Sequence, residues 1–200
     1  MPMRVAVAVS GRGSNLEALF ERLGNGDDAR VVLVISDRAE APALDRARER
    51  GVAAMALQDW RSAEEWLAAL TAESVDLLVL AGYLKLVPAE VIARYRGRII
   101  NVHPALLPAF GGKGMYGIRV HEAVLQSGAV ESGCTVHLVE EEYDRGMILV
   151  QARVPVLPGD TAQVLASRVL EQEHRLLPAV VLAAARAGHP VVIEPSPASR

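Results

Sequence analysis

"RVAVAVSGRGSNLEALF", residues 4–20, joins an apolar run to a glycine-rich turn and then to a stretch with helical spacing. The run at 4–9 is short and rich in valine, which is typical of a strand buried on both faces of a parallel sheet. After Asn15 the apolar residues recur at the spacing of a buried helix face. A strand that passes through a tight turn directly into a helix begins a β-α-β unit. The segment therefore predicts an α/β fold.

The same alternation continues along the first half of the chain. Apolar, β-branched runs alternate with segments of helical period, which predicts a mostly parallel, twisted sheet with helices on both faces. The predicted strands are RVAVAV (4–9), RVVLVI (30–35), VAAMAL (52–57), DLLVLAG (76–82) and RIINVH (98–103). The predicted helices cover 15–23, 42–50, 62–72 and 88–95.

The pattern changes after a glycine-rich loop and a short helix predicted over 120–127. Two strand-like runs follow at 133–139 and 148–156, with only about nine residues between them, so a crossover helix does not fit and they should pair antiparallel. A long last helix is predicted from about 161 to 187, with Asp160 or Thr161 as its N-cap.

The composition limits the classes of function. The chain has 200 residues, 51% of them hydrophobic, enough to bury a full core. Its formal charge of −3 and its mixed charges argue against nucleic-acid binding and favour small-molecule partners. Cys134 is the only cysteine, which argues against a disulfide framework. No apolar run is long enough to span a bilayer and no signal-peptide pattern opens the chain, so we expect a cytoplasmic protein.

The turn at 11–15 is a candidate anion site. Its backbone N–H groups are free at the positive end of a helix, and Gly11 and Gly13 let the backbone approach an anion closely. Ser14 can bind the anion or cap the helix. A P-loop would need a lysine that this turn lacks, and a dinucleotide-binding loop would need glycine in place of Leu16. A monophosphate fits better than either, and a plain tight turn is the alternative.

A second candidate lies in "IINVHPALLPAF", residues 99–110. Asn101 and His103 are two apart on a strand and point to the same side, just before Pro104 ends the ladder. Capping of a turn is the alternative explanation. At the carboxyl end of a parallel strand, the pair would share a ligand-binding rim with the 11–15 turn. An amide donor beside an imidazole suits an oxyanion that forms and collapses, as in acyl or formyl transfer.

Acidic residues before the last strand are a third candidate. Glu140, Glu141 and Glu142 are expected to be solvated. Asp144 differs, because a Tyr-Asp-x-Gly turn places it at the end of the sheet. Its carboxylate is a candidate to orient His103 and to stabilise its charge.

Five segments carry a resemblance to a known family. They are SGRGSNLEAL (10–19), VLAGYLKLVP (79–88), IINVHPALLPAF (99–110), GCTVHLVEEEYDRGMILVQ (133–151) and QEHRLLPAVV (172–181). In this order they resemble the phosphoribosylglycinamide formyltransferases, folate-dependent transformylases of purine biosynthesis, from about residue 4 to 190. The Asn-x-His-Pro-x-Leu-Leu-Pro block is specific to the wider formyltransferase superfamily, and the Ser-Gly-x-Gly-Ser-Asn loop to the glycinamide ribonucleotide branch.

The resemblance implies a Rossmann-like formyltransferase fold and a reaction. A formyl group would pass from 10-formyltetrahydrofolate, the co-substrate, to the amine of glycinamide ribonucleotide, with no metal and with His103 protonated. The implied catalytic residues are Asn101, His103 and Asp144, and Glu173 would receive the substrate amine. The implied phosphate-binding residues are Gly13, Ser14 and Asn15. The implied folate-binding residues are Tyr83, Leu84, Lys85, Leu86, Val87, Asn101, Glu140, Glu141, Tyr143 and Asp144.

Residues 1–190 are then expected to form a single formyltransferase domain, followed by a tail at 191–200. Its first half, 1–100, would bind the nucleotide phosphate, and 101–190 would carry catalysis and most of the folate pocket. The implied partners are the two small-molecule substrates, without nucleic acid or membrane, and a homodimer is possible. A formyltetrahydrofolate hydrolase and a non-catalytic nucleotide-binding module are the alternative functions.

The chain departs from the family pattern at two places. Ala105 replaces the serine that often follows His-Pro, and the loop at 110–118 is longer and richer in glycine. We expect that loop to be a mobile lid. His121 is expected at the exposed start of a helix, with a position near the substrate as the alternative. His137 is expected to be a core histidine, and support of the catalytic residues together with Thr135 is the alternative.

Overall fold

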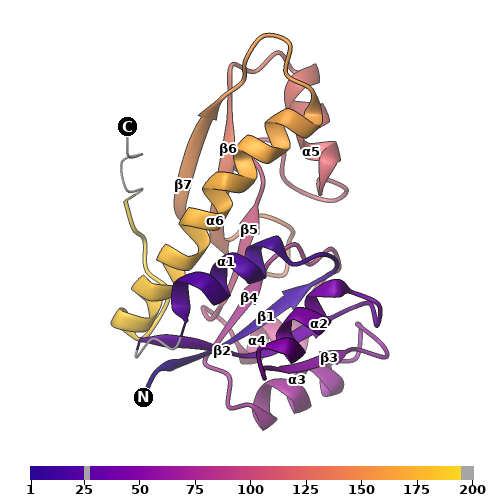
Figure 1. Cartoon of the computed structure of the whole chain (residues 1–200), viewed down its shortest axis with the longest axis vertical. Helices are drawn as coiled ribbons and strands as arrows, with labels where there is room; N and C mark the ends of the chain where they lie inside the picture. The colour runs from indigo at the N-terminus through magenta and orange to yellow at the C-terminus, as the bar shows by residue number, and fades with distance from the viewer. Residues whose placement is uncertain (25–27, 195–200) are drawn as a thin grey trace.

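One seven-stranded sheet with helices on both faces forms the fold (Figure 1). The computed structural model describes residues 1–24 and 28–194. The strands are β1 (Met3–Val9), β2 (Ala29–Ser36), β3 (Ala53–Ala56), β4 (Leu77–Leu80), β5 (Ile99–His103), β6 (Glu131–Leu138) and β7 (Ile148–Pro155). The helices are α1 (Ser14–Leu23), α2 (Pro42–Glu49), α3 (Ala63–Ala72), α4 (Ala89–Arg94), α5 (Ile118–Gln126) and α6 (Ala162–Ala187).

The strand order is β3-β2-β1-β4-β5-β6-β7. Strands β1 to β5 pair in parallel, whereas β6 is antiparallel to both β5 and β7. This arrangement confirms the predicted parallel sheet and the predicted antiparallel pair. The chain runs outward from β1 to β3 and then returns to β4 on the other side of β1. Such a reversal leaves a crevice at the carboxyl ends of the central strands, where open α/β sheets bind ligands.

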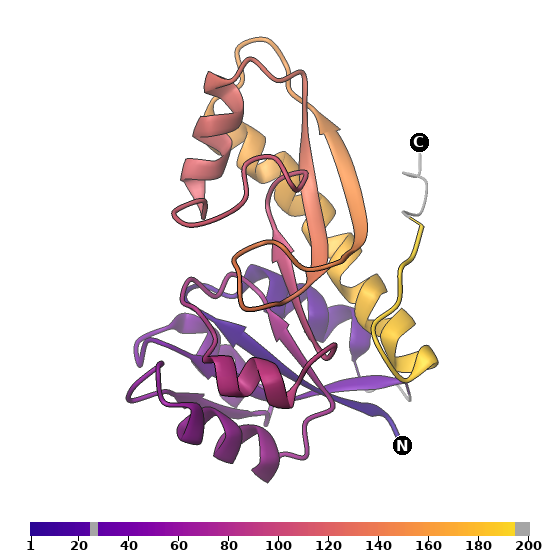
Figure 2. The same ribbon diagram turned by 180° about the vertical axis from the view of Figure 1, so that it is seen from behind.

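Strand β1 explains why the sheet needs helices on both faces. Val5, Val7 and Val9 pack into a core with α1, α2 and α6, while Ala6 and Ala8 pack into a second core with α3 and α4. Successive side chains of a strand point to opposite faces, so a strand without polar residues is stable only between two layers. Figure 1 shows α1 and α6 in front of the sheet, and Figure 2 shows α4 in front of the opposite face.

The last helix begins at a side-chain cap. The Thr161 hydroxyl accepts the Val164 N–H at 3.3 Å, whereas Asp160 pairs with Arg168 at 2.6 Å. Of the two predicted N-caps, Thr161 is therefore the one used. The helix ends at Gly188, whose φ of 79° is the left-handed conformation that favours glycine.

The segment after α6 runs beside the edge strand β7. The Ile193 N–H donates to the Leu149 carbonyl at 3.0 Å. The tail predicted from residue 191 lies mostly outside the described residues, which end at 194. None of the described helices is both long and apolar enough to cross a bilayer.

Candidate active site

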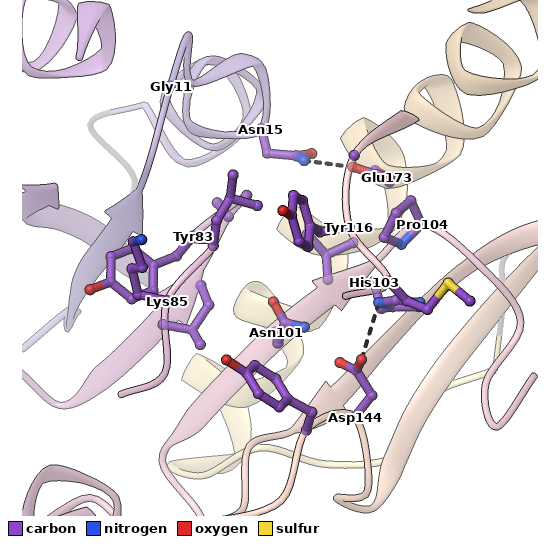
Figure 3. Close-up of a pocket in the computed structure, with 18 of the residues that line it drawn as sticks. Gly11, Asn15, Tyr83, Lys85, Asn101, His103, Pro104, Tyr116, Asp144 and Glu173 are labelled. Atoms are coloured by element: carbon purple, nitrogen blue, oxygen red, sulfur yellow. Dashed lines mark hydrogen bonds and ion pairs between the residues drawn. The ribbon is translucent and has the colours of Figure 1, made fainter. Parts of the chain in front are cut away.

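A cleft of about 1090 Å³ opens at the carboxyl ends of β1, β4 and β5 (Figure 3). It is the site that the strand order predicts. Its walls come from distant parts of the chain, which are residues 11–15, 80–87, 101–104, 112–119 and 142–144, with side chains of α6. All three candidate regions found in the sequence therefore meet in one cavity.

The 11–15 turn enters α1 without a side-chain cap. Gly13 is the N-cap, with φ 75°, and no side chain accepts a hydrogen bond from the first turn. Ser14 is thus the first helical residue and does not cap the helix, which leaves its hydroxyl beside the cleft. Uncapped N–H groups at a helix start form an anion site. A Cβ at Gly13 would lie 2.7 Å from the Ala43 Cβ, so only glycine fits there.

Asn15 and Glu173 join the first helix to the last. The Asn15 Nδ2 donates to Glu173 Oε2 at 2.7 Å, as the dashed line in Figure 3 marks. Both residues are 7% exposed, and the Asn15 Oδ1 is buried without a partner among the described residues. Burial raises the pKa of Glu173, although the hydrogen bond from Asn15 opposes that effect. The carboxyl group thus faces the cleft beside the anion site.

Asn101 and His103 lie at the end of β5, and Asp144 approaches them from the loop after β6 (Figure 3). The His103 Nδ1 is 3.6 Å from Asp144 Oδ2. The Gly112 N–H donates to the same oxygen at 2.8 Å. The three residues expected to act together are therefore neighbours.

A turn holds Asp144 in place. Its φ of 55° is left-handed, a conformation that Asp, Asn and Gly tolerate better than other residues. A Cβ at Gly146 would collide with the Leu138 carbonyl, so the glycine of the Tyr-Asp-x-Gly sequence lets the two backbones meet. The sequence predicted that a turn positions this carboxylate, and the backbone explains how.

The protonation of His103 differs from the expectation. Burial lowers the pKa of His103, and the opposing effects of Asp144 and the Phe110 carbonyl do not reverse that shift. The free protein therefore favours a neutral imidazole at neutral pH, not the expected cation. The His103 Nε2 lies 2.8 Å from the Phe110 carbonyl oxygen, which only accepts, so Nε2 carries the proton. Asp144 stays ionised, because burial raises its pKa less than the histidines and the Gly112 N–H lower it.

The segment from Tyr83 to Val87 forms the opposite wall. Tyr83 is buried and packs edge-to-face on Trp66, with ring centroids 5.5 Å apart. The Leu84 N–H donates to the Ser10 hydroxyl at 2.9 Å, which fixes this wall to the end of β1. Leu84 and Leu86 are exposed, as side chains of an apolar ligand wall would be.

The family follows from a comparison with known proteins. A family model described as formyl transferase matches residues 3–181. The chain belongs to the formyl transferase family.

Three similar proteins illustrate the match. The chloroplastic phosphoribosylglycinamide formyltransferase of Arabidopsis thaliana is 45% identical over 186 residues, or 89% of this chain. The chain spans 64% of that plant protein's length. A phosphoribosylglycinamide formyltransferase of Haemophilus influenzae is 36% identical, over 89% of this chain and 85% of its own. The crystal structure of phosphoribosylglycinamide formyltransferase from Anaplasma phagocytophilum superposes with a TM-score of 0.86 at 38% identity, covering 94% of this chain and 88% of that chain.

Two further histidines line the cleft. His121 is 4% exposed and lines the cleft from α5, so the prediction of an exposed helix start is wrong. Its Nδ1 has no partner among the described residues. Burial, with a smaller effect of the nearby His103, lowers the pKa of His121 to about 4. His137 also lines the cleft, 3.1 Å from Asn101 and 3.5 Å from Asp144. Its contact with Asn101 follows from the pairing of β5 with β6.

Thr135 supports the segment that follows His103. Its buried hydroxyl donates to the Ala105 carbonyl at 2.6 Å and accepts the Leu107 N–H at 3.0 Å. The Gln151 Nε2 also donates to it at 2.9 Å. These three hydrogen bonds are the contacts that a supporting role for Thr135 requires.

The cleft does not contain every predicted residue. Glu141 is absent from its lining, and its exposed side chain lies 4.0 Å from Arg96. Glu140, Glu142 and Tyr143 do line it, and the three glutamates are exposed as predicted. Across residues 1–24 and 28–194, no three His, Cys, Asp or Glu side chains gather as metal ligands.

Proposed function

We propose that this chain transfers the formyl group of 10-formyltetrahydrofolate to the amine of glycinamide ribonucleotide, in de novo purine biosynthesis. The observation that carries the proposal is the meeting of Asn101, His103 and Asp144 in a cleft that also holds an uncapped helix start. A phosphate site beside an amide, an imidazole and a carboxylate suits acyl transfer to a phosphorylated amine. The relatives named as phosphoribosylglycinamide formyltransferases support the same substrates.

Each substrate has a set of residues to bind it. The nucleotide phosphate would lie on the N–H groups of Gly13, Ser14 and Asn15. Glu173 would receive the glycinamide amine, because its carboxylate is buried next to that loop. The folate would lie along the Tyr83 to Val87 wall, with its N10 directed to the end of β5.

In the proposed reaction, one proton moves from the attacking amine to the folate N10. The amine nitrogen attacks the formyl carbon, and the carbonyl oxygen becomes an oxyanion that accepts a hydrogen bond from the Asn101 amide. Burial disfavours the charged form of His103 in the free protein, and the nearby oxyanion favours it, so His103 takes up the proton that the attacking nitrogen loses. Collapse of the intermediate breaks the bond to the folate N10, and His103 passes the same proton to that nitrogen. Asp144 stabilises the imidazolium while it exists. No metal is part of the proposal.

The two alternatives differ in one measurable requirement. A formyltetrahydrofolate hydrolase would use the same three residues with water as acceptor, and a non-catalytic module would bind nucleotide alone. Purified protein is incubated with 10-formyltetrahydrofolate, with and without glycinamide ribonucleotide, and release of tetrahydrofolate is followed. We expect release that depends on the amine. Equal release without it would identify the hydrolase, and no release would favour the module.

The remaining expectations are part of the same proposal. Residues 1–190 would act as one domain in the cytoplasm, where the buried Cys134 thiol stays reduced. A homodimer stays a prediction, which sedimentation across a range of protein concentrations would test.

A further inference from the structure

His137 lies directly across the sheet from Asn101. The antiparallel register of β5 and β6 pairs these two residues, so their side chains share a face of the sheet. The His137 ring is only 2% exposed, and its Nε2 is 3.1 Å from the Asn101 Nδ2. A side chain of β6 therefore touches the residue to which the proposed function gives the oxyanion contact.

Two contacts determine where the proton of His137 resides. Its Nδ1 lies 2.7 Å from the Leu138 carbonyl oxygen. A carbonyl only accepts, so Nδ1 must be the donor. The Asn101 Nδ2 only donates, so Nε2 must be the acceptor. Both contacts require the same form of the ring, which is neutral with its proton on Nδ1.

One neighbour opposes that form. The Asp144 Oδ1 is 3.5 Å from the same Nε2, and a carboxylate favours a proton there. That contact is longer than the 3.1 Å contact with Asn101 and lies at the limit of hydrogen bonding. Asp144 accepts the Gly112 N–H and faces His103 through its other oxygen, Oδ2. The distances therefore favour the Asn101 contact over an ion pair.

We propose that His137 is a positioning residue, which holds the Asn101 amide in one of its two orientations by accepting from Nδ2. The inference rests on the proposed function. With Nδ2 turned toward His137, the second N–H of the same nitrogen remains for the oxyanion. A rotated amide would present its carbonyl oxygen to that negative charge, and the donor would be lost.

The first test needs no variant and no activity. Protein labelled with ¹⁵N at histidine is studied by NMR at about pH 8, where an ordinary histidine is neutral and its tautomer can be identified. We expect the His137 ring, assigned by through-bond correlation, to carry its proton on Nδ1 and none on Nε2. A proton on Nε2 at this pH would overturn the proposal. This result is independent of whether the protein transfers formyl groups.

Kinetics separate positioning from a structural role. His137→Ala should lower kcat about ten- to a hundredfold, with KM for both substrates nearly unchanged, because only the oxyanion contact is lost. His137→Gln offers an amide oxygen as acceptor and should recover part of that loss. His189→Gln is the matched control, since the exposed His189 also contacts a neighbouring carbonyl at 3.0 Å but lies outside the cleft. An unchanged kcat in a folded His137→Ala protein would refute positioning.

Discussion

Replacing Gly13 by alanine tests the fit of the phosphate loop. Gly13 has φ 75°, and the new Cβ would stand 2.7 Å from the Ala43 Cβ of α2. A left-handed alanine costs about 1–2 kcal/mol, and a side chain forced into a filled space costs about 1–3 kcal/mol more. Gly13→Ala should therefore lower the free energy of unfolding by about 2–5 kcal/mol, a large part of a typical domain's stability.

Three further variants separate the two costs, which are Gly51→Ala, Ala43→Gly and the double variant Gly13→Ala with Ala43→Gly. Gly51 has φ 69° and open space around its Cβ position, so Gly51→Ala should show the backbone cost alone. In the double variant Gly13→Ala with Ala43→Gly, the colliding methyl group is gone. That protein should regain about 1–3 kcal/mol beyond the sum of the single effects. Urea unfolding followed by circular dichroism measures the wild type and the four variants.

Ligand binding completes the experiment. The N–H groups of the loop must shift to admit the methyl group, so calorimetry should show at least about tenfold weaker binding of glycinamide ribonucleotide to Gly13→Ala. Binding of a folate analogue should stay close to the wild-type value, because the atoms nearest to the new methyl group belong to Ala43 and Leu16 and not to the Tyr83 to Val87 wall. The reasoning is refuted if Gly13→Ala is no less stable than Gly51→Ala, or if both ligands weaken equally.

Three other predictions concern the residues around the reaction. Asp144→Asn keeps a residue that tolerates φ 55° but removes the charge that favours protonated His103, so kcat should fall a hundredfold or more with little change in KM; near-normal turnover would make Asp144 only a turn residue. His121 has a pKa of about 4 when folded and an ordinary value near 6.5 when unfolded, so it stabilises the fold above pH 6.5 and that stability is lost as pH falls toward 4. Urea unfolding of His121→Gln should accordingly show a smaller loss of unfolding free energy between those pH values than the wild type shows. Identical pH profiles of the two proteins would contradict this explanation. Thr135→Val leaves the Leu107 N–H without its acceptor and should cost about 2–4 kcal/mol, while Thr135→Ser stays near wild type; equal stability of the two variants would show that the hydroxyl is dispensable.

The sequence predicted the central strands because a buried parallel strand has to be apolar throughout. The run at 5–9 is apolar throughout and buried, and β1 covers 3–9. Strand β4 ends earlier than predicted, at Leu80, because Gly82 takes a left-handed φ of 74° and turns the chain into the cleft wall. Asn101 and His103 could be placed in the cleft because their position at a parallel strand's carboxyl end is a local property.

Features that depend on burial or on strand register could not be predicted. His121 looks polar in the sequence, and only the packing of α5 over the cleft buries it. The contact between His137 and Asn101 depends on the register between β5 and β6, and no local pattern encodes that register. Burial also lowers the pKa of His103, whereas a neighbouring carboxylate alone would have raised it.

The hydrogen bond between Asn15 and Glu173 joins residues 158 positions apart. Contacts at such a separation form late in folding, because a long loop must close before they contribute any energy. A nascent chain that has folded β1 to β5 would already present the glycine turn and Asn101 but would lack Glu173. We expect the cleft to become competent only when α6 docks on α1. When refolding is followed by hydrogen exchange, the amides of α6 should therefore become protected before substrate binding is first detected, or at the same time.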